Sequence, residues 1–132
     1  MIRAAFVLLA VMAAAQAQPT QAQPTKAPGS QSSPDTWLPR GNAELQVLDT
    51  VNAKAATVTL RVGQSADNAS LSIVLRACVI RPPDMRADSA AFLDIADSRR
   101  GAPGFHGWMF ANEPAVSMLE HPIYSVRLVG CR

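Results

Sequence analysis

Residues 71–80 constrain the fold most, because they form one long strand pattern with apolar side chains on both faces. Side chains alternate across a strand, and one face of this one carries Leu71, Ile73, Leu75, Ala77 and Val79. The opposite face carries Ser72, Val74, Arg76, Cys78 and Ile80. Pro82 and Pro83 end the strand, since consecutive prolines cannot donate to a sheet ladder. The pattern predicts a strand that is buried on both sides for part of its length.

Other strand patterns lie on either side of this segment. Residues 57–62 alternate apolar with polar side chains and are enriched in β-branched residues. Comparable patterns occupy residues 43–49, 90–95, 107–111 and 124–131. Two segments between them contain turn-forming residues: residues 63–69 predict a turn, and residues 101–104 predict a loop that joins two strands as a hairpin.

One short helix is predicted after the last aromatic strand. Asn112 is a suitable N-cap, Pro114 fits the first turn, and His121-Pro122 ends the segment. Met118 and Leu119 are expected to point inward from this helix. Together the patterns predict an all-β fold, a small sandwich or barrel of about six short strands with one short helical turn.

The first seventeen residues have the layout of a cleaved secretory signal peptide. Arg3 gives a positive start, residues 4–15 are apolar, and Ala15-Gln16-Ala17 offers small residues at the cleavage positions. Ala13-Ala14-Ala15 is an acceptable alternative site. Past this leader, no apolar run approaches the roughly 20 residues that a spanning helix needs. We therefore expect a periplasmic protein, exported through a signal peptide over residues 1–17, with no transmembrane segment after cleavage.

A tether is predicted between the leader and the folded part. Residues 18–39 are rich in Gln, Pro, Thr and Ser, and Ala-Gln-Pro-Thr occurs twice, at 17–20 and 22–25. Such a segment has too little apolar surface to offset the entropy lost on ordering, so we expect it to be disordered. It is either a spacer or a tolerated leftover, with Trp37 and Leu38 docked on the domain edge. The β-domain itself is expected over residues 40–132.

The two cysteines, Cys78 and Cys131, predict one disulfide, because the leader places the chain in an oxidising compartment. Their bond would close a loop of about 54 residues and stabilise the fold by about 4 kcal/mol. A Cys-x-x-Cys motif is absent, and the sequence places no further metal ligands near either cysteine. We therefore expect a structural bridge, with no metal site and no cofactor.

The charge pattern argues against nucleic acid as a partner. The formal net charge is +2, and the arginines are scattered among acidic residues along the chain. A nucleic-acid-binding protein concentrates positive charge on one face to neutralise phosphates. No such cluster is readable here.

Catalytic signatures are weak. No Gly-x-Ser-x-Gly motif is present, and only His106 and His121 can serve as a base at neutral pH. Structural roles are the favoured interpretation of both, His121 at a helix end and His106 in packing or a loop hydrogen bond. A hydrolase-like site that combines either histidine with Asp94 is the alternative, and it requires these side chains to converge in one pocket.

The segment from Gly104 to Asn112 is the most distinctive, because most aromatic residues of the domain lie there. Alternation places Phe105 and Met109 on one side and Trp108 and Phe110 on the other. One side is expected to be core. The other, if exposed, is an apolar patch that marks a partner surface, with Phe105, Trp108, Phe110, Arg76 and Arg81 as candidate contacts. The alternatives are a strand buried on both faces and arginines that are ordinary surface charges.

Several runs together resemble a known family. They are AELQVLD at 43–49, RAC at 76–78, RPP at 81–83, AFLDI at 91–95, GWMFA at 107–111, LEHPIY at 119–124 and GC at 130–131. In this combination the chain resembles the alphaproteobacterial family called domain of unknown function 2155 over nearly all of residues 43–131. The resemblance implies secreted members with paired cysteines and no assigned activity. It carries over no catalytic or binding residue.

These observations support a non-enzymatic periplasmic domain that acts as an interaction or accessory module of the cell envelope, with an envelope protein or polymer as partner. The alternatives are a binder of a small ligand or envelope polymer, and a hydrolase-like enzyme using His106 or His121. A third is a secreted inhibitor whose exposed loop is residues 81–88.

Overall fold

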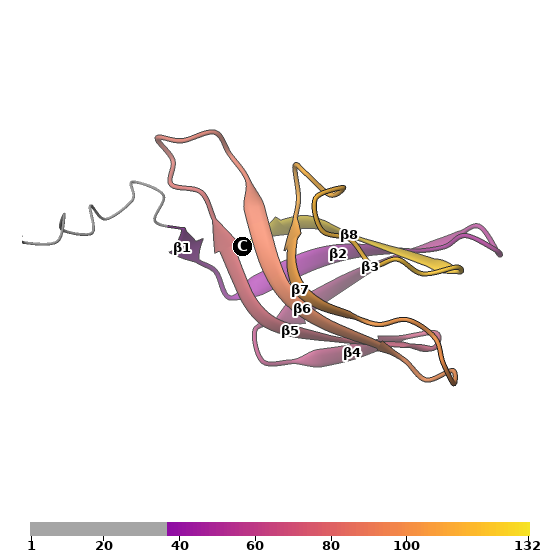
Figure 1. The fold of residues 1–132 in the computed structure, drawn as a ribbon. Coiled ribbons are helices and arrows are strands. Elements are labelled where there is room, and N and C mark those ends of the chain that lie inside the picture. The colour runs from indigo at the N-terminus through magenta and orange to yellow at the C-terminus, as the bar shows by residue number, and fades with distance from the viewer. Residues whose placement is uncertain (1–36) are drawn as a thin grey trace, which may run out of the picture. The chain divides into compact units, whose positions relative to one another are not determined.

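Two antiparallel β-sheets make up residues 37–132, the part of the chain that the computed structural model describes (Figure 1). In the five-stranded sheet the strand order is β1-β5-β6-β7, and β4 also pairs with β5. Its strands are β1 (Leu38–Pro39), β4 (Ser65–Asn68), β5 (Leu71–Ile80), β6 (Ser89–Asp97) and β7 (Phe105–Phe110). The three-stranded sheet has the order β3-β2-β8. Its strands are β2 (Asn42–Asp49), β3 (Lys54–Arg61) and β8 (Tyr124–Cys131).

The predicted all-β class is confirmed, and all six predicted strands are present, those at 71–80 and 124–131 with the predicted ends and the other four with shifted ends. Two short strands were not expected. β4 lies within residues 63–69, which were predicted as a turn, and it forms a hairpin with the start of β5. β1 falls in the last residues of the predicted tether and pairs with the end of β5 through Leu38 opposite Ile80. The predicted signal peptide and the remaining tether lie outside the described residues.

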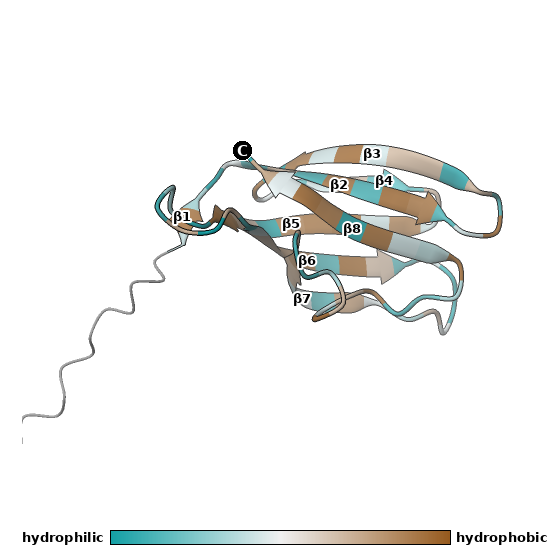
Figure 2. Cartoon of the chain, turned by 90° about the horizontal axis from the view of Figure 1, so that it is seen from above, coloured by the Kyte–Doolittle hydropathy of each residue, from teal (hydrophilic) through white to brown (hydrophobic). Residues whose placement is uncertain are grey.

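The core lies between the facing sides of the two sheets, where alternate residues of each strand are buried. Figure 2 shows the corresponding alternation of hydrophobic and hydrophilic residues along β2, β5 and β8. The three-stranded sheet contributes Ala43, Leu45, Val47, Leu60, Tyr124, Val126 and Leu128. The five-stranded sheet contributes Leu71, Ile73, Leu75, Cys78, Ala91, Leu93, Ile95 and Met109. No residue within 37–132 belongs to a helix that is long and apolar enough to cross a membrane.

A bulge in β5 changes which side chains face the core. The register with β6 shifts between Leu75 and Ala77, so Arg76 is the extra residue. Strict alternation predicted Ala77 and Val79 on the face of Leu71 and Cys78 on the other, and this assignment is wrong beyond Leu75. Because a bulge adds one residue, it exchanges the two faces that follow it. Cys78 therefore turns into the core, where it is only 2% exposed.

A second bulge, in β8, turns Cys131 toward Cys78. The register of β2 with β8 shifts so that Leu45 pairs with Leu128 and Glu44 with Gly130, which leaves Val129 as the extra residue. Cys131 then lies opposite Ala43, a fully buried position. The predicted disulfide between Cys78 and Cys131 is present, with 5.8 Å between the two Cα atoms. It joins the five-stranded sheet to the three-stranded sheet across the core.

The helix predicted from Asn112 to His121 is absent; this segment consists of turns and irregular backbone. Asn112 does not cap a helix, because its backbone N–H donates to Asp88 and its side-chain amide donates to the carbonyl of Ala87. A helix this short has little stability without a packed face. Leu119 enters the core as expected, whereas Met118 is half exposed, at 50%.

Candidate functional site

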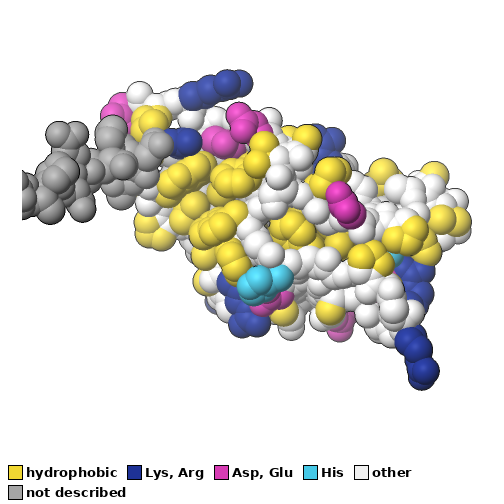
Figure 3. Space-filling model, in the orientation of Figure 1, with side chains coloured by type: hydrophobic (Ala, Val, Ile, Leu, Met, Phe, Trp, Pro, Cys, Tyr) yellow, Lys and Arg dark blue, Asp and Glu magenta, His cyan; other side chains and the backbone are white. Residues whose placement is uncertain are grey.

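The outer face of the five-stranded sheet, turned away from the core, carries a cluster of four aromatic side chains that we call the aromatic patch: Trp37, Phe92, Trp108 and Phe110. The pairing of β5 with β6 and of β6 with β7 explains why these side chains lie close together. Val79, Ala90 and Phe110 form one row across β5, β6 and β7, and Ala77, Phe92 and Trp108 form the next. Figure 3 shows hydrophobic side chains gathered on the face of the molecule that bears these strands.

Trp108 is the most exposed member of the aromatic patch, at 39%. Its ring meets Phe92 edge to face, with 5.4 Å between the ring centroids. Trp37 approaches Phe110 at 6.4 Å, and the guanidinium of Arg81 lies 4.5 Å from the centre of the Trp37 ring. Such ring contacts hold the side chains in fixed orientations without burying Trp108.

Between these rings is a shallow hollow of about 390 Å³. Its walls and floor come from Trp37, Val79, Ala90, Trp108 and Phe110. None of these side chains except the two indoles carries a polar atom, so the hollow suits an apolar group. Ala90, only 2% exposed, lies at its floor, and a larger side chain at this position would fill part of the space.

A polar cluster borders the aromatic patch on the next row of the sheet. Arg76 donates from Nε to Asp94 at 2.5 Å, and His106 Nδ1 also bonds the Asp94 carboxylate. Hydrogen bonding to Arg76 and then to His106 lowers the pKa of Asp94. The His106 ring in turn packs edge to face on Phe92, at 5.0 Å. Arg76 lies on the outer face, as alternation from the buried Leu75 places it, beside Asp94.

The other histidine belongs to a buried cluster on the opposite side of β6. The side chains of His121 and Asp97 are both fully removed from solvent, and His121 Nε2 lies 3.0 Å from Asp97 Oδ2. His121 Nδ1 accepts backbone N–H groups from Ile123 at 3.2 Å and Tyr124 at 3.1 Å. Since Nδ1 is an acceptor, the proton sits on Nε2 and is donated to Asp97. His121 therefore ties the segment before β8 to the end of β6.

The buried cluster predicts a loss of stability in acid. Hydrogen bonding to Arg99 is the largest cause that lowers the pKa of Asp97 below its ordinary value of 3.8. A lowered pKa in the folded state means that the charged carboxylate stabilises the fold above pH 3.8, and that this contribution is lost as the pH falls below it. We expect the unfolding free energy of wild type to exceed that of Asp97→Asn at neutral pH, with a difference that shrinks in acid. Urea titrations at several pH values measure this.

The control for that titration is Glu120→Gln, which alters an exposed carboxylate that makes no hydrogen bond within residues 37–132. The difference in unfolding free energy between Glu120→Gln and wild type should change little with pH. If the difference in unfolding free energy between wild type and Asp97→Asn stays constant from pH 7 to below pH 3.8, the charged Asp97 carboxylate does not stabilise the fold as predicted.

The two histidines do not form one site. Asp94 and Asp97 lie on opposite faces of β6, so their partners His106 and His121 face opposite sides of the sheet. Among the described residues no serine hydroxyl is bonded to either imidazole, and no group of three potential ligands that could hold a metal ion is present. The arrangement therefore lacks the convergence that a site using both histidines requires.

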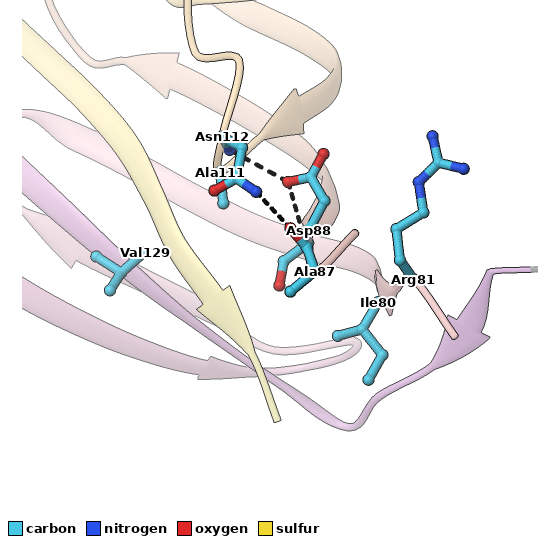
Figure 4. Close-up of a pocket in the computed structure, with 8 residues that line it drawn as sticks. Ile80, Arg81, Ala87, Asp88, Ala111, Asn112 and Val129 are labelled. Carbon is cyan, nitrogen blue, oxygen red and sulfur yellow. Dashed lines mark hydrogen bonds between the residues drawn. The ribbon is translucent and has the colours of Figure 1, made fainter. Parts of the chain in front are cut away.

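Another hollow, of about 250 Å³, lies where the loop after β5 meets the end of β7 (Figure 4). Asp88 accepts the backbone N–H groups of Ser89 and Asn112, and Figure 4 shows Asn112 also donating to Ala87. These bonds fix the loop at residues 81–88 to the end of β7. The polar groups of this hollow are thus engaged in holding the chain together.

The structure divides the predicted contact residues between two faces. Trp108 and Phe110 lie in the aromatic patch, and Arg76 and Arg81 border it. Phe105 is on the inner side, packed against the core.

The sequence interpretation did not place Trp37 and Phe92 in the patch, because only the strand register brings them beside β7. The aromatic residue in the strand pattern at 90–95 was the available signal for Phe92.

Comparison with known proteins places the chain in a family. No curated protein and no solved structure matches it. A family profile matches residues 43–131. That span contains both cysteines, the bulges that orient them, and the residues of the patch on β6 and β7. The chain belongs to the family described as an uncharacterized protein conserved in bacteria (DUF2155).

Proposed function

We propose that this protein is a non-enzymatic binding module of the bacterial cell envelope, exported to the periplasm, which holds a partner protein against the aromatic patch. The observation that carries the proposal is Trp108, a large aromatic side chain that is 39% exposed within a cluster of aromatic neighbours. Tryptophan is enriched among the residues that dominate binding energy at protein interfaces. An exposed apolar surface bordered by polar groups is typical of such interfaces.

The lining of the hollow favours a protein over an envelope polymer as the partner. A glycan presents hydroxyl groups that need hydrogen-bond partners, because desolvated hydroxyls are costly. The hollow offers mainly apolar surface from Val79, Ala90 and the aromatic rings. An apolar side chain from a partner protein satisfies this lining, and the polar cluster of Arg76, Asp94 and His106 then lies at the rim.

Two features support the periplasmic part of the proposal. The first seventeen residues carry the features of a leader. The bond between Cys78 and Cys131 is of the kind that persists in oxidising compartments.

Trp108→Ala is expected to abolish partner capture while leaving the fold intact. Removing a central tryptophan from an interface typically costs about 2 kcal/mol or more, a loss of roughly 30-fold in affinity. The measurement is chemical crosslinking in intact cells, followed by quantitative mass spectrometry of proteins recovered with wild type and variant. The disulfide and the thermal midpoint of the variant report on its folding.

Val116→Ala is the matched control, because Val116 is 68% exposed on the segment after β7 and lies outside the aromatic patch. It should retain every partner. Retention of all partners by a folded Trp108→Ala variant would refute the patch as the binding surface. Recovery of an envelope glycan in place of a protein would show that the partner class is wrong.

A further inference from the structure

The outer edge of β7 is an open edge of the five-stranded sheet. β7 pairs with β6 on one side, and no backbone hydrogen bond within residues 37–132 reaches its other side. Ala111 donates its N–H to the carbonyl of Ser89, its opposite residue, so these two form a hydrogen-bonded pair. Such pairs alternate along an antiparallel ladder. The backbone groups of Met109, Gly107 and Phe105 therefore point toward β6.

It follows that the N–H and C=O groups of His106, Trp108 and Phe110 point away from β6, toward the unpaired side of the strand. These are the same three residues whose side chains lie on the outer face of the sheet. A strand that paired with this edge would thus bond to the backbone of the residues that carry the aromatic patch and the polar cluster. Unpaired edges of this kind are templates for pairing with another chain.

β7 also lacks the features that protect the other long edges. β3 begins with Lys54 and ends with Arg61, and β8 carries Arg127 and the bulge at Val129. Charges and bulges on edge strands oppose pairing with a second strand. The sequence of β7 is FHGWMF, which contains no Lys, Arg, Asp, Glu or Pro.

We propose that β7 pairs antiparallel with β7 of a second copy of this chain, about a two-fold axis at Trp108, and joins two five-stranded sheets into one. The edge is self-complementary in this register. Trp108 faces Trp108 of the second copy, and His106 faces Phe110, so every outward N–H meets an outward C=O. β7 carries no Lys, Arg, Asp or Glu, and this register sets each His106 opposite Phe110, so like charges do not face each other along the strand.

This pairing goes beyond the proposed function because it forms the binding surface from residues of two copies of the chain. The second copy sets its own Trp108 beside this one and its Phe110 beside His106, on the same outer face. Paired aromatic side chains on opposed strands stabilise a sheet. A partner protein would then meet one continuous aromatic surface contributed by both copies.

Sedimentation equilibrium of the purified exported protein tests the pairing without any partner protein. We expect a monomer–dimer equilibrium between about 1 µM and 1 mM. His106→Pro removes one outward N–H from each copy and adds a ring at the edge, a position where proline is compatible with an edge strand. His106→Ala is the matched control, since it loses the same imidazole and keeps the N–H.

The dimer dissociation constant of His106→Pro should exceed that of His106→Ala by about tenfold or more, because two backbone hydrogen bonds are lost in each dimer. Native disulfide and thermal midpoint of both variants establish that they fold. A wild-type protein that remains monomeric at the highest concentration overturns the proposal, as do equal dissociation constants for the two variants.

Trp108→Cys tests the register. Opposed residues of a hydrogen-bonded pair have Cα atoms about 5.5 Å apart, within the range that a disulfide spans. Because both native cysteines are paired with each other, the introduced thiol is the only free one. We expect rapid oxidation of Trp108→Cys to a covalent dimer, and much slower oxidation of Val116→Cys. Equal rates would overturn the two-fold register.

Failure of the pairing is distinguishable from failure of the proposed function. A monomeric wild-type protein whose partner capture still depends on Trp108 overturns the pairing and leaves the binding surface in place. A dimeric wild-type protein, together with a Trp108→Ala variant that captures partners unchanged, supports the pairing and overturns the binding surface.

Discussion

Replacing both cysteines with alanine, Cys78→Ala with Cys131→Ala, will lower the free energy of unfolding by about 4 kcal/mol. The bridge spans a sequence separation of 53 residues and joins the two sheets through the core. Without it the unfolded chain regains the conformational freedom that the closed loop had removed. Urea denaturation under non-reducing conditions measures the loss. For a domain of this size, whose total stability is typically about 5–15 kcal/mol, the loss is a large share.

Reductant provides the control for this experiment. Adding it should destabilise wild type and leave the double variant unchanged, because only wild type has a bond to lose. A double variant within about 1 kcal/mol of wild type would contradict the prediction, since the loop-closure effect is several times larger.

His121→Leu is expected to destabilise the fold by about 2–4 kcal/mol, the second largest effect. Leucine has a similar size but no nitrogen atoms. The backbone N–H groups of Ile123 and Tyr124 lose their acceptor, and Asp97 loses a donor, in a place where both side chains are removed from solvent. A buried donor without an acceptor costs about 1–3 kcal/mol, and these two N–H groups are only partly buried, so about 1–2 kcal/mol each is expected. Asp97 keeps its bonds to Arg99. Urea denaturation at neutral pH measures the change.

His106→Leu is the matched control on the other face of the sheet. His106 also bonds an aspartate, but its side chain is 74% exposed, so water replaces the lost contact. Exposed ion pairs contribute about 0–1 kcal/mol. Equal losses for the two variants would show that burial does not distinguish the two histidines, contrary to the structure.

Local patterns were sufficient to predict the six longer strands but not the short β1 and β4, because alternation is readable only over a run of several residues. Leu71, Ile73 and Leu75 face the core as the period of two indicates. The pairing of the cysteines also followed from the sequence, since the chain contains only two. The turn residues at 101–104 correctly indicated the hairpin between β6 and β7.

The predicted helix failed because its signals were equally compatible with a loop held by distant residues. Asn112 and Pro114 are common at helix starts. Here Asn112 is bonded to the loop at residues 87–88, and His121 is bonded to Asp97 at the end of β6. Those partners are distant in sequence, so no local pattern revealed them.

The candidate site also depended partly on the sequence and partly on how the strands pair. The sequence alone singled out Trp108 and Phe110 as one face of a strand, and it could not say which face was exposed. Trp37 and Phe92 join them only through the registers of β1 with β5 and of β6 with β7. Cross-strand neighbours are set by pairing, and pairing depends on the whole sheet.

The sequence by itself determined the all-β class, the positions of the main strands and the single disulfide, since each rests on local alternation or on the count of cysteines. The tertiary structure alone decided which faces are buried after Leu75 and after Leu128, because the bulges at Arg76 and Val129 exist only relative to the strands that they pair with. Those two extra residues turn Cys78 and Cys131 toward each other. Arg76 itself stays on the outer face that alternation assigns to it, bonded to Asp94 beside the patch of Trp108.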